Sequence, residues 1–421
     1  MMDQIRIGLL GLGTVGTGVV KTIRLQEEKL SERLGKKVQI VKILVKDVLK
    51  PRPVEVNPGL LTTDFADVLK EKPDVIIEVM GGLQPAFQYI NQAIEKGCHV
   101  VTANKELLAK WGDKLIRTAN QHQVHLFYEA SVAGGIPVIS VLRHFLRTND
   151  ISEIKGILNG TTNYILTQME QHGKSYDDVL KEAQQLGYAE TDPTSDVEGF
   201  DALYKATILS QLLFGKAPAV DEASREGISR ITIEEIGLAK ALGYRFKLIA
   251  QVKGEKDGVQ VSVRPSLLPF SHSLAQIEDA FNAVQLTGNI VGDLLFTGIG
   301  AGEFPTASAV VEDLAYLLSQ PVLAQPEWSI AEGKKADPAF KRAYFVYWDQ
   351  NKSPLAFHDL LHQLEEANCK ILTQIGQESE KMGLVVEGDF RIEQLAHVGV
   401  YPILGTINAE ITADENIPLV I

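Results

Sequence analysis

Cysteine is scarce in this chain, with only Cys98 and Cys369 among 421 residues. Two isolated cysteines supply neither a disulfide framework nor the clustered ligands of a zinc motif, which is typical of a reducing compartment. Long apolar runs are also missing, and none approaches the roughly 18 residues of a membrane-spanning helix. The N-terminal MMDQIRIGLLGLG enters a strand-like run without a basic leader, so we expect no signal or transit peptide. We therefore predict a cytoplasmic protein without a membrane partner.

Positive charge is in deficit, because 41 Lys and Arg oppose 54 Asp and Glu, for a net charge of −13. This balance argues against a nucleic-acid partner bound through bulk charge. It does not exclude a small charged substrate, which responds to local charge. The length exceeds what one core usually fills, so we expect two or three domains.

A glycine-rich turn follows the first predicted strand. In QIRIGLLGLGTVGTGVVKTI, an apolar strand at about residues 5–10 precedes a GxGxxG motif and a helix-like segment. The glycines permit a tight turn, close approach of the backbone to a pyrophosphate, and close packing of the helix. The free N–H groups of the helix start then meet the phosphates. We predict a dinucleotide site with the candidate cofactor-binding residues Gly11, Gly13, Thr14, Val15 and Gly16.

The runs VQIVKILV, DVIIEVM, HVVTAN and VHLFYEA alternate with helical stretches, which predicts a parallel sheet covered by helices. At the end of the second strand, an NAD-selective site usually places an acid against the ribose 2′-OH. Lys46 lies there instead, with Lys50 and Arg52 close behind and Asp47 one step later. Cations suit a 2′-phosphate, so we favour NADP over NAD. A solvated basic loop is the alternative.

The strand in VVTANKELLA brings polar residues to the ligand edge. Thr102, Asn104 and Lys105 follow a parallel strand at its carboxyl end, where open α/β sheets bind their ligands. Lys105 is therefore a candidate site residue, with a first-turn surface lysine as the alternative.

The helix–strand alternation breaks after FYEASVAGGIPVISVLRHFL. There the glycines of VAGGIP indicate only a turn, although exposed carbonyls beside Glu129 could hold a hard cation. ISEIKGILNGTTNYIL predicts a strand and then a Gly-Thr-Thr turn that caps a helix. SYDDVLKEAQQLGYAETDP predicts a second helix, from Ser175 as N-cap to Gly187 as the glycine after its end.

An acidic run follows, in which five carboxylates fall within twelve residues: Glu190, Asp192, Asp196, Glu198 and Asp201. If DVEGFDALYKATILSQ is helical, Asp201 and Lys205 share one face a turn apart. A solvated acidic loop with a surface ion pair is one interpretation. The apolar residues after Lys205 imply that the helix packs, which makes this lysine a candidate acid/base group beside a carboxylate.

These motifs resemble those of homoserine dehydrogenases. GLGTVG, TANK, EASVAGGIP, LNGTTNYIL, LGYAETDPTSDVEGFDALYK and GIGAGEFPTASAVVEDL follow in that family's order over residues 1 to about 320. The resemblance implies an NAD(P)-dependent oxidoreductase of the CH–OH group that interconverts L-homoserine and L-aspartate 4-semialdehyde in threonine, methionine and isoleucine biosynthesis. No aspartate-kinase segment is seen, so we expect a monofunctional enzyme.

The resemblance also implies roles for individual residues. Lys205 matches the proton donor and acceptor at the substrate oxygen, and Lys105 matches a second active-site lysine. Glu190 and Asp201 match acids that hold the substrate, with Asp196 in the same network. Gly187 matches a glycine of this pocket.

Two further matches concern the cofactor and a cation. Gly302 matches a glycine near the nicotinamide. The family implies a structural monovalent cation, such as sodium, held by Glu129 and by the backbone carbonyls of Val132, Gly134 and Ile136.

The last third of the chain shows a strand-helix-strand-strand-helix-strand order, which is ferredoxin-like. Its runs are AYFVYWDQ, PLAFHDLLHQLEEANC, KILTQIGQ, KMGLVVEG, RIEQLAHVGV and YPILGTINAEI. In position it resembles the ACT domain that many homoserine dehydrogenases append, but NKSPLAF lacks the glycine of the usual Pro-Gly turn. A threonine effector site and a pairing module therefore both stay open.

We expect an α/β protein with three domains. They are an NADP-binding Rossmann domain over 1–130, an α+β substrate-binding and oligomerisation domain over 131–320, and a ferredoxin-like ACT domain over 341–421. Residues 295–320 are expected to pack back on the first domain, and 321–340 to form a linker. We also expect a homo-oligomer, a dimer or a tetramer.

Other functions remain as alternatives, including other Rossmann oxidoreductases such as deaminating amino-acid dehydrogenases. A semialdehyde dehydrogenase that forms a thiohemiacetal needs a cysteine at the ligand edge, and Cys98 and Cys369 are placed elsewhere. A non-catalytic amino-acid sensor is the third alternative, against which the presence of Lys105 and Lys205 argues.

Overall fold

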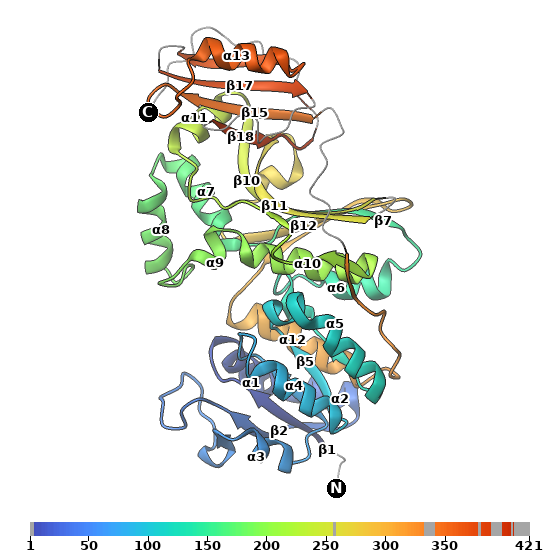
Figure 1. Cartoon of the computed structure of the whole chain (residues 1–421). Coiled ribbons are helices and arrows are strands. Elements are labelled where there is room, and N and C mark those ends of the chain that lie inside the picture. The colour runs from blue at the N-terminus through green and yellow to red at the C-terminus, as the bar shows by residue number, and fades with distance from the viewer. Residues whose placement is uncertain are drawn as a thin grey trace.

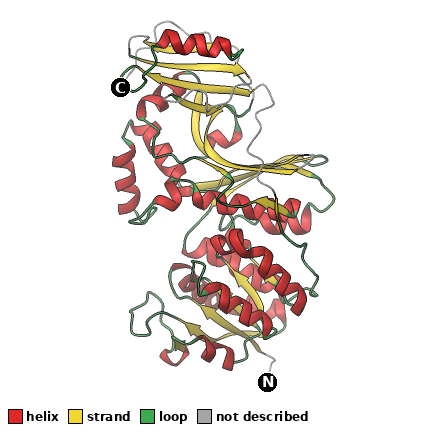
Figure 2. Ribbon diagram, viewed as in Figure 1, coloured by secondary structure: helices red, strands yellow, loops and turns green. Residues whose placement is uncertain are grey.

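The computed structural model describes residues 4–255, 258–331, 342–377, 380–388, 398–405 and 407. Three bodies, each built on its own sheet, follow one another from the N-terminus to the C-terminus (Figures 1 and 2). In the described ranges, no helix has both the length and the apolarity needed to cross a membrane.

The first body is a six-stranded parallel sheet in the order β3-β2-β1-β4-β5-β6. Strands β4 and β5 are almost fully buried and mostly apolar before their last residues, because helices cover both faces of the sheet. The predicted Rossmann-type sheet is thereby confirmed. Its elements are β1 (Gln4–Leu10), α1 (Thr14–Leu25), α2 (Glu27–Leu34), β2 (Lys37–Leu44), η1 (Pro58–Leu60), β3 (Leu61–Thr62), α3 (Phe65–Lys70), β4 (Val75–Glu78), α4 (Ala86–Glu95), β5 (His99–Thr102), α5 (Lys105–His122) and β6 (Leu126–Phe127).

The turn between β1 and α1 needs its glycines for different reasons. Gly11 has a φ of 104°, a conformation that side chains disfavour. A Cβ at Gly16 would lie 2.2 Å from the carbonyl oxygen of Gly11, so only glycine lets α1 start this close to the turn. Gly13 faces open space, with no atom within 4 Å of an added Cβ.

The second body carries a sheet in the order β13-β12-β7-β10-β11-β9. Helices α7 and α10 pack against its central strands, and α10 also contacts α5 of the first body (Figure 1). Its elements are η2 (Glu129–Ser131), α6 (Val138–Ser140), η3 (Val141–Phe145), β7 (Ile151–Ile157), α7 (Gly160–His172), α8 (Tyr176–Gln185), α9 (Thr194–Val197), α10 (Phe200–Phe214), β8 (Lys216–Pro218), β9 (Ser224–Arg225), α11 (Ile233–Ala241), β10 (Tyr244–Glu255), β11 (Gly258–Pro269), η4 (Ser273–Gln276), β12 (Phe281–Gly288) and β13 (Gly292–Ile299).

Two local predictions in this body are wrong. The N-cap of α7 is Asn159, whose Oδ1 accepts the N–H of Thr162 at 2.8 Å, so the Gly-Thr-Thr segment lies inside the helix. The stretch 196–211 is not one helix, because Gly199 adopts a φ of 79° and separates α9 from α10. The caps predicted for α8 are confirmed, with Ser175 accepting the N–H of Asp178 and Gly187 in a left-handed conformation after the end.

After β13 the chain returns to the first body. Helix α12 (Glu303–Leu317) lies against α1, and a Cβ at Gly18 would come within 2.4 Å of the Glu303 carbonyl oxygen. The buried side chains Val310 and Leu314 join the core of the first body.

Residues 320–331, here called the strap, then lead back to the second body. Gln325 exchanges hydrogen bonds with Asn120 at 2.9 Å, and Trp328 is buried over Gly112. The strap ends in β14 (Ser329–Ala331), which pairs in parallel with β8. Of the expected linker, residues 332–340 lie outside the described ranges.

The third body is an antiparallel sheet in the order β16-β17-β15-β18, with helix α13 on one face. This is the strand order of a ferredoxin-like fold. The helix predicted in RIEQLAHVGV lies mostly outside the described residues, since 389–397 are not described. The elements are β15 (Arg342–Asp349), α13 (Phe357–Glu366), β16 (Lys370–Gln377), β17 (Lys381–Gly388) and β18 (Gly399–Pro402).

The third body is attached to the second by backbone and side-chain bonds. Ile403 forms a parallel bridge to Leu267 of β11, and the N–H of Leu404 donates to the Leu267 carbonyl at 2.9 Å. The Tyr401 hydroxyl donates to the buried Glu235 carboxylate of α11 at 2.7 Å.

Candidate active site

Asp201, in the first turn of α10, lies at the centre of a buried charge cluster. Its Oδ2 accepts from Lys205 Nζ at 2.6 Å and from Asn159 Nδ2 at 2.9 Å, and its Oδ1 pairs with Lys105 Nζ at 2.8 Å. The Asp201 side chain is only 5% exposed. Lys105 is the first residue of α5, so this carboxylate joins the first body to the second.

The two lysines have different surroundings. Lys205 is buried and also donates to the Leu158 carbonyl at 2.6 Å, and burial lowers its pKa despite the opposing effect of Asp201. Lys105 keeps 41% of its side chain exposed, and Asp201 raises its pKa. Burial alone would raise the pKa of Asp201, but the two ammonium groups outweigh it and hold that pKa well below the usual range.

Two more predicted residues border this cluster. Asp196 accepts from Asn159 Nδ2 at 2.7 Å, and burial together with the Asp201 charge raises its pKa. Glu190 lies at the rim, exposed, beside an open hollow of about 510 Å³. After Asp201, the charges of Asp196 and Glu190 add to the raised pKa of Lys105. Gly187 has a φ of 78° and open space where a side chain would be.

The remaining acids of the run serve local structure. Asp192 accepts the N–H of Thr194 at 3.1 Å, and Glu198 accepts the Ser229 hydroxyl at 2.6 Å. The sequence did not single out Asn159 or the Leu158 carbonyl, which both belong to the cluster. An asparagine directly before a predicted helix is an N-cap signal, and it could have drawn attention to Asn159.

A cavity of about 600 Å³ opens at the carboxyl ends of the first sheet. Gly11, Gly13 and Thr14 line it, while Val15 is partly buried in the core and Gly16 lies under the turn. Gly302 is the N-cap of α12, next to Glu303, which also lines the cavity. The open face of Gly13 and the helix start beside it suit the pyrophosphate of a dinucleotide.

Three cations lie where this cavity meets the end of β2: Lys46, Lys50 and Arg52. Asp47 is also in the lining, but its Oδ1 accepts the N–H of Leu49 at 2.8 Å within its own turn. Arg52 donates to the Lys50 carbonyl at 2.7 Å, which holds the basic loop in shape.

The predicted cation site also has a defined geometry. Glu129 is buried, and its two carboxylate oxygens accept the N–H groups of Ile139 at 2.8 Å and Ser140 at 2.6 Å. Burial raises the pKa of Glu129. Gly134 has a φ of 53° and packs so closely on Gly300 that a Cβ would lie 2.3 Å from its carbonyl oxygen.

These oxygen donors suit a hard cation, because carboxylate and carbonyl oxygens each keep a further lone pair. Among the described residues, no group of three or more His, Cys, Asp or Glu side chains could hold a metal ion. A cation here would therefore depend on the backbone carbonyls.

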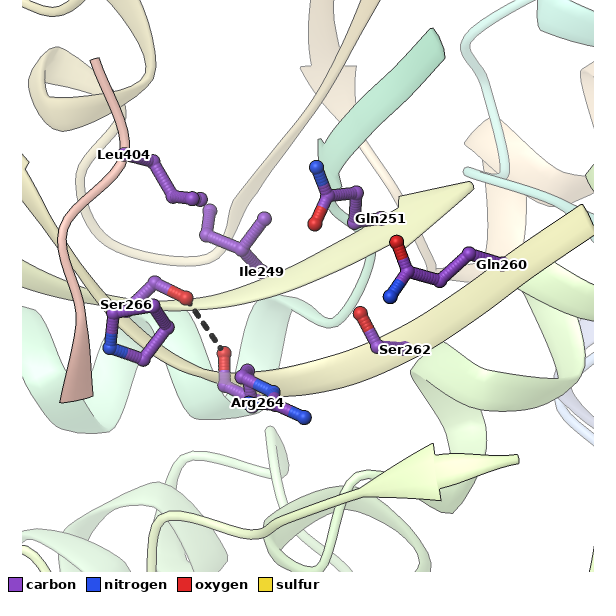
Figure 3. A pocket seen from close by; sticks show the side chains of 8 residues that line it. Ile249, Gln251, Gln260, Ser262, Arg264, Ser266 and Leu404 are labelled. Carbon is purple, nitrogen blue, oxygen red and sulfur yellow. Dashed lines mark hydrogen bonds between the residues drawn. The ribbon is translucent and has the colours of Figure 1, made fainter. Parts of the chain in front are cut away.

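A much smaller pocket lies between the second and third bodies (Figure 3). Gln251, Gln260, Ser262 and Ser266 from β10 and β11 line it together with Leu404. Its volume is about 20 Å³, enough for a water molecule but too small for a substrate. Because side chains alternate along a strand, these residues lie on the sheet face opposite to α10.

The cysteines are unsuited to covalent catalysis. Cys98 is buried at the amino end of β5, donates to the Pro73 carbonyl, and has a pKa raised by burial to about 11. Cys369 is buried in the third body.

The dinucleotide-type cavity and the lysine–carboxylate cluster beside it define an oxidoreductase that uses a nicotinamide cofactor. Family models described as "Homoserine dehydrogenase, NAD binding domain" and "Homoserine dehydrogenase" match residues 11–129 and 137–315. The homoserine dehydrogenase of Bacillus subtilis is 46% identical over 75% of this chain and 73% of its own length. The chain belongs to the homoserine dehydrogenase family, NAD(P)-dependent enzymes that interconvert L-homoserine and L-aspartate 4-semialdehyde.

Solved structures agree with this assignment over nearly the whole chain. The crystal structure of a homoserine dehydrogenase from Thiobacillus denitrificans superimposes with a TM-score of 0.86 at 37% identity, covering 96% of this chain and 99% of that one. A hyperthermophilic archaeal homoserine dehydrogenase in complex with NADPH has a TM-score of 0.63 at 28% identity, with 76% and 100% covered. The resemblance inferred from the motifs is thus confirmed.

Replacing Asp201 with asparagine tests the charge cluster. Asp201→Asn removes the one carboxylate that contacts both ammonium groups, so we expect a loss of about 3–5 kcal/mol of stability at neutral pH. A buried lysine with a lowered pKa disfavours folding below that pKa. The loss should therefore shrink as the pH rises toward the ordinary lysine value near 10.5.

Thermal unfolding between pH 7 and pH 10 measures this effect. Asp196→Asn is the matched control, because Asp196 accepts only one hydrogen bond from a neutral amide in this cluster. Equal unfolding temperatures for the two variants across this range would contradict the central place of Asp201.

Proposed function

We propose that Lys205 is the proton donor and acceptor in the interconversion of L-homoserine and L-aspartate 4-semialdehyde. The observation that carries this proposal is a buried lysine with a lowered pKa, fixed by Asp201 and the Leu158 carbonyl. As an ammonium it donates a proton to the aldehyde oxygen in reduction, and as an amine it accepts the hydroxyl proton in oxidation. The nicotinamide supplies the hydride chemistry when bound.

The acidic residues next to Lys205 would hold the substrate. Glu190, Asp196 and Asp201 form a negative border around the two lysines, which suits the ammonium group of an amino-acid substrate. Gly187 belongs to the same pocket, where its lack of a side chain leaves room. Lys105 is the second catalytic lysine of the proposal, and its half-exposed ammonium can contact the substrate directly.

Replacement of Lys205 is the decisive test. Lys205→Met keeps the apolar stem, so we expect a folded protein whose kcat for homoserine oxidation falls about 100- to 10,000-fold, the size of a lost acid/base group. Lys110→Met is the control, because Lys110 pairs with Glu106 on α5 away from Asp201. NADPH fluorescence should show unchanged cofactor binding in both variants. Near wild-type turnover of Lys205→Met would contradict the assignment of Lys205 as the acid/base group, whereas no turnover by the folded wild-type protein would favour a sensor without catalysis.

We further propose that NADP is preferred over NAD, on the support of Lys46, Lys50 and Arg52 at the cavity wall. Lys46→Ala should weaken NADPH binding roughly tenfold, because a charge-assisted bond to the 2′-phosphate contributes about 1.5–3 kcal/mol. NADH binding should change less than about twofold. Lys42→Ala is the control, since Lys42 on β2 bonds to the Gly59 carbonyl instead. Equal losses for the two cofactors, measured by fluorescence titration, would argue against a phosphate contact.

A structural monovalent cation, such as sodium, is proposed at Glu129 and the carbonyls of Val132, Gly134 and Ile136. Because a bound ion stabilises only the folded state, the unfolding temperature should be higher in sodium chloride than in choline chloride at equal ionic strength. The Glu129→Gln variant should lose this difference. The same response of wild type to both salts would remove the cation from the proposal.

For the third body we propose an ACT-like regulatory role, with pairing of subunits as the alternative. A hollow of about 370 Å³ lies beside the loop between β15 and α13, lined by Trp348, Ser353 and Phe357 among others. Inhibition by threonine would support an effector site, whereas no inhibition, with an oligomer seen in sedimentation analysis, would support a pairing surface.

The proposal also includes the location and assembly of the protein. We propose a cytoplasmic homo-oligomer, a dimer or tetramer, with domains bounded near residues 130, 320 and 340.

A further inference from the structure

Glu78, the last residue of β4, is completely buried where the cofactor cavity meets α5. Its Oε1 accepts the N–H groups of Met80 at 2.8 Å and Gly81 at 3.3 Å, and its Oε2 accepts the Thr102 hydroxyl at 2.6 Å. All three partners are donors, so the carboxyl group acts here as an acceptor. Burying a carboxylate is costly, and a neutral residue could fill the same space without that cost.

The Thr102 hydroxyl connects Glu78 to the start of α5. Its oxygen accepts the N–H of Asn104 at 3.0 Å, so its own proton is free to point at Glu78. Asn104 is the N-cap of α5, and its Oδ1 accepts the N–H of Leu107 at 3.2 Å. Hydrogen-bond donation thus runs from the Asn104 N–H to the Thr102 hydroxyl, and from that hydroxyl to the Glu78 carboxylate.

Asn104 closes a ring of hydrogen bonds, because its Nδ2 donates to the Gly82 carbonyl at 2.7 Å. The ring therefore runs from Glu78 through residues 80–82 to Asn104, and back through Thr102. Gly81 and Gly82 both have positive φ values, 75° and 74°, so this loop needs external bonds to keep its shape.

The ring joins two parts of the site that have different tasks. On one side, Val79 and Met80 line the cofactor cavity. On the other, Lys105 follows Asn104 directly, and its Nζ lies 2.8 Å from Asp201. A shift of the α5 cap would therefore displace Lys105 from the carboxylate it shares with Lys205.

We propose that Glu78 is a positioning residue, which holds Lys105 in its reactive place through the same bonds that shape the cofactor cavity wall. This inference rests on the proposed roles of Lys105 and Lys205. The inference predicts that loss of the buried Thr102 hydroxyl reduces turnover, although this hydroxyl bonds to Glu78 and not to Lys105 or Lys205. Small misplacements of reacting groups can cost about 100-fold in rate.

The test compares Thr102→Val, which removes the hydroxyl at nearly constant shape, with Thr102→Ser, which keeps it. Thr102→Val should lower kcat for homoserine oxidation about 10- to 100-fold, whereas Thr102→Ser should stay within about threefold of wild type. Glu78→Gln should lower kcat similarly and also weaken NADPH binding in fluorescence titration, because its amide cannot serve all three donors.

A pH profile distinguishes positioning from a purely structural role. Burial is the main cause of the lowered pKa of Lys205, and the Lys105 charge lowers this pKa further. If Lys105 moves away, the protonated form of Lys205 becomes less unfavourable, and its pKa rises. The pH midpoint for homoserine oxidation should therefore move upward in Thr102→Val and stay unchanged in Thr102→Ser.

Each outcome has a defined meaning. If folded Thr102→Val has a kcat within about twofold of wild type and an unchanged pH midpoint, Glu78 is a structural residue and the inference is overturned. The serine and valine pair decides the question even if Glu78→Gln does not fold. Failure of the wild-type enzyme to oxidise homoserine would instead reject the proposed function, before the ring is tested.

Discussion

Asp201 has to neutralise two ammonium groups at once, and this requirement fixes how the first two bodies are joined. One lysine begins α5 in the first body, and the other lies one turn further along α10 in the second. A cation at a helix start is opposed by the helix dipole, whereas an acid in the first turn of α10 is favoured by it. The carboxylate therefore compensates for the unfavourable place of Lys105 and for the burial of Lys205.

The same carboxylate also separates the two lysines in chemical behaviour. Lys105 is half exposed and Asp201 raises its pKa, so Lys105 stays protonated at neutral pH. Lys205 is buried deeper, and desolvation together with the neighbouring ammonium lowers its pKa. Neighbouring groups whose pKa values are pushed apart are typical of acid/base pairs with divided roles. In the proposed mechanism, the charge of Lys105 orients the substrate and Lys205 moves the proton.

Much of this site could be predicted from sequence because its parts are local. The glycine turn, the caps of α8 and the i,i+4 spacing of Asp201 and Lys205 depend on neighbours within a few residues. The helix break at Gly199 could not be predicted, because an apolar helical pattern follows it directly and a single left-handed glycine does not interrupt that pattern.

Other parts depend on contacts between distant segments. That Lys105 meets Asp201 follows from the packing of α5 on α10, which no spacing encodes. The direction of the pKa change at Lys205 depends on how deeply the helix is buried, so the sequence could name the opposing effects but not weigh them. Asp47 likewise lies one step after the usual position of a ribose-binding acid, and only its bond to Leu49 shows that the carboxylate serves its own turn.

The strap has a consequence for motion in this enzyme. The chain passes between the first two bodies three times, before β7, after β13 and along the strap, whose Trp328 sits over Gly112 of α5 and whose end pairs with β8 directly after α10. The two lysine-bearing helices are thus tied together at their far ends as well as through Asp201. Any separation of the two bodies would therefore have to break the Gln325–Asn120 bonds and the β14–β8 pairing as well as the Lys105–Asp201 ion pair.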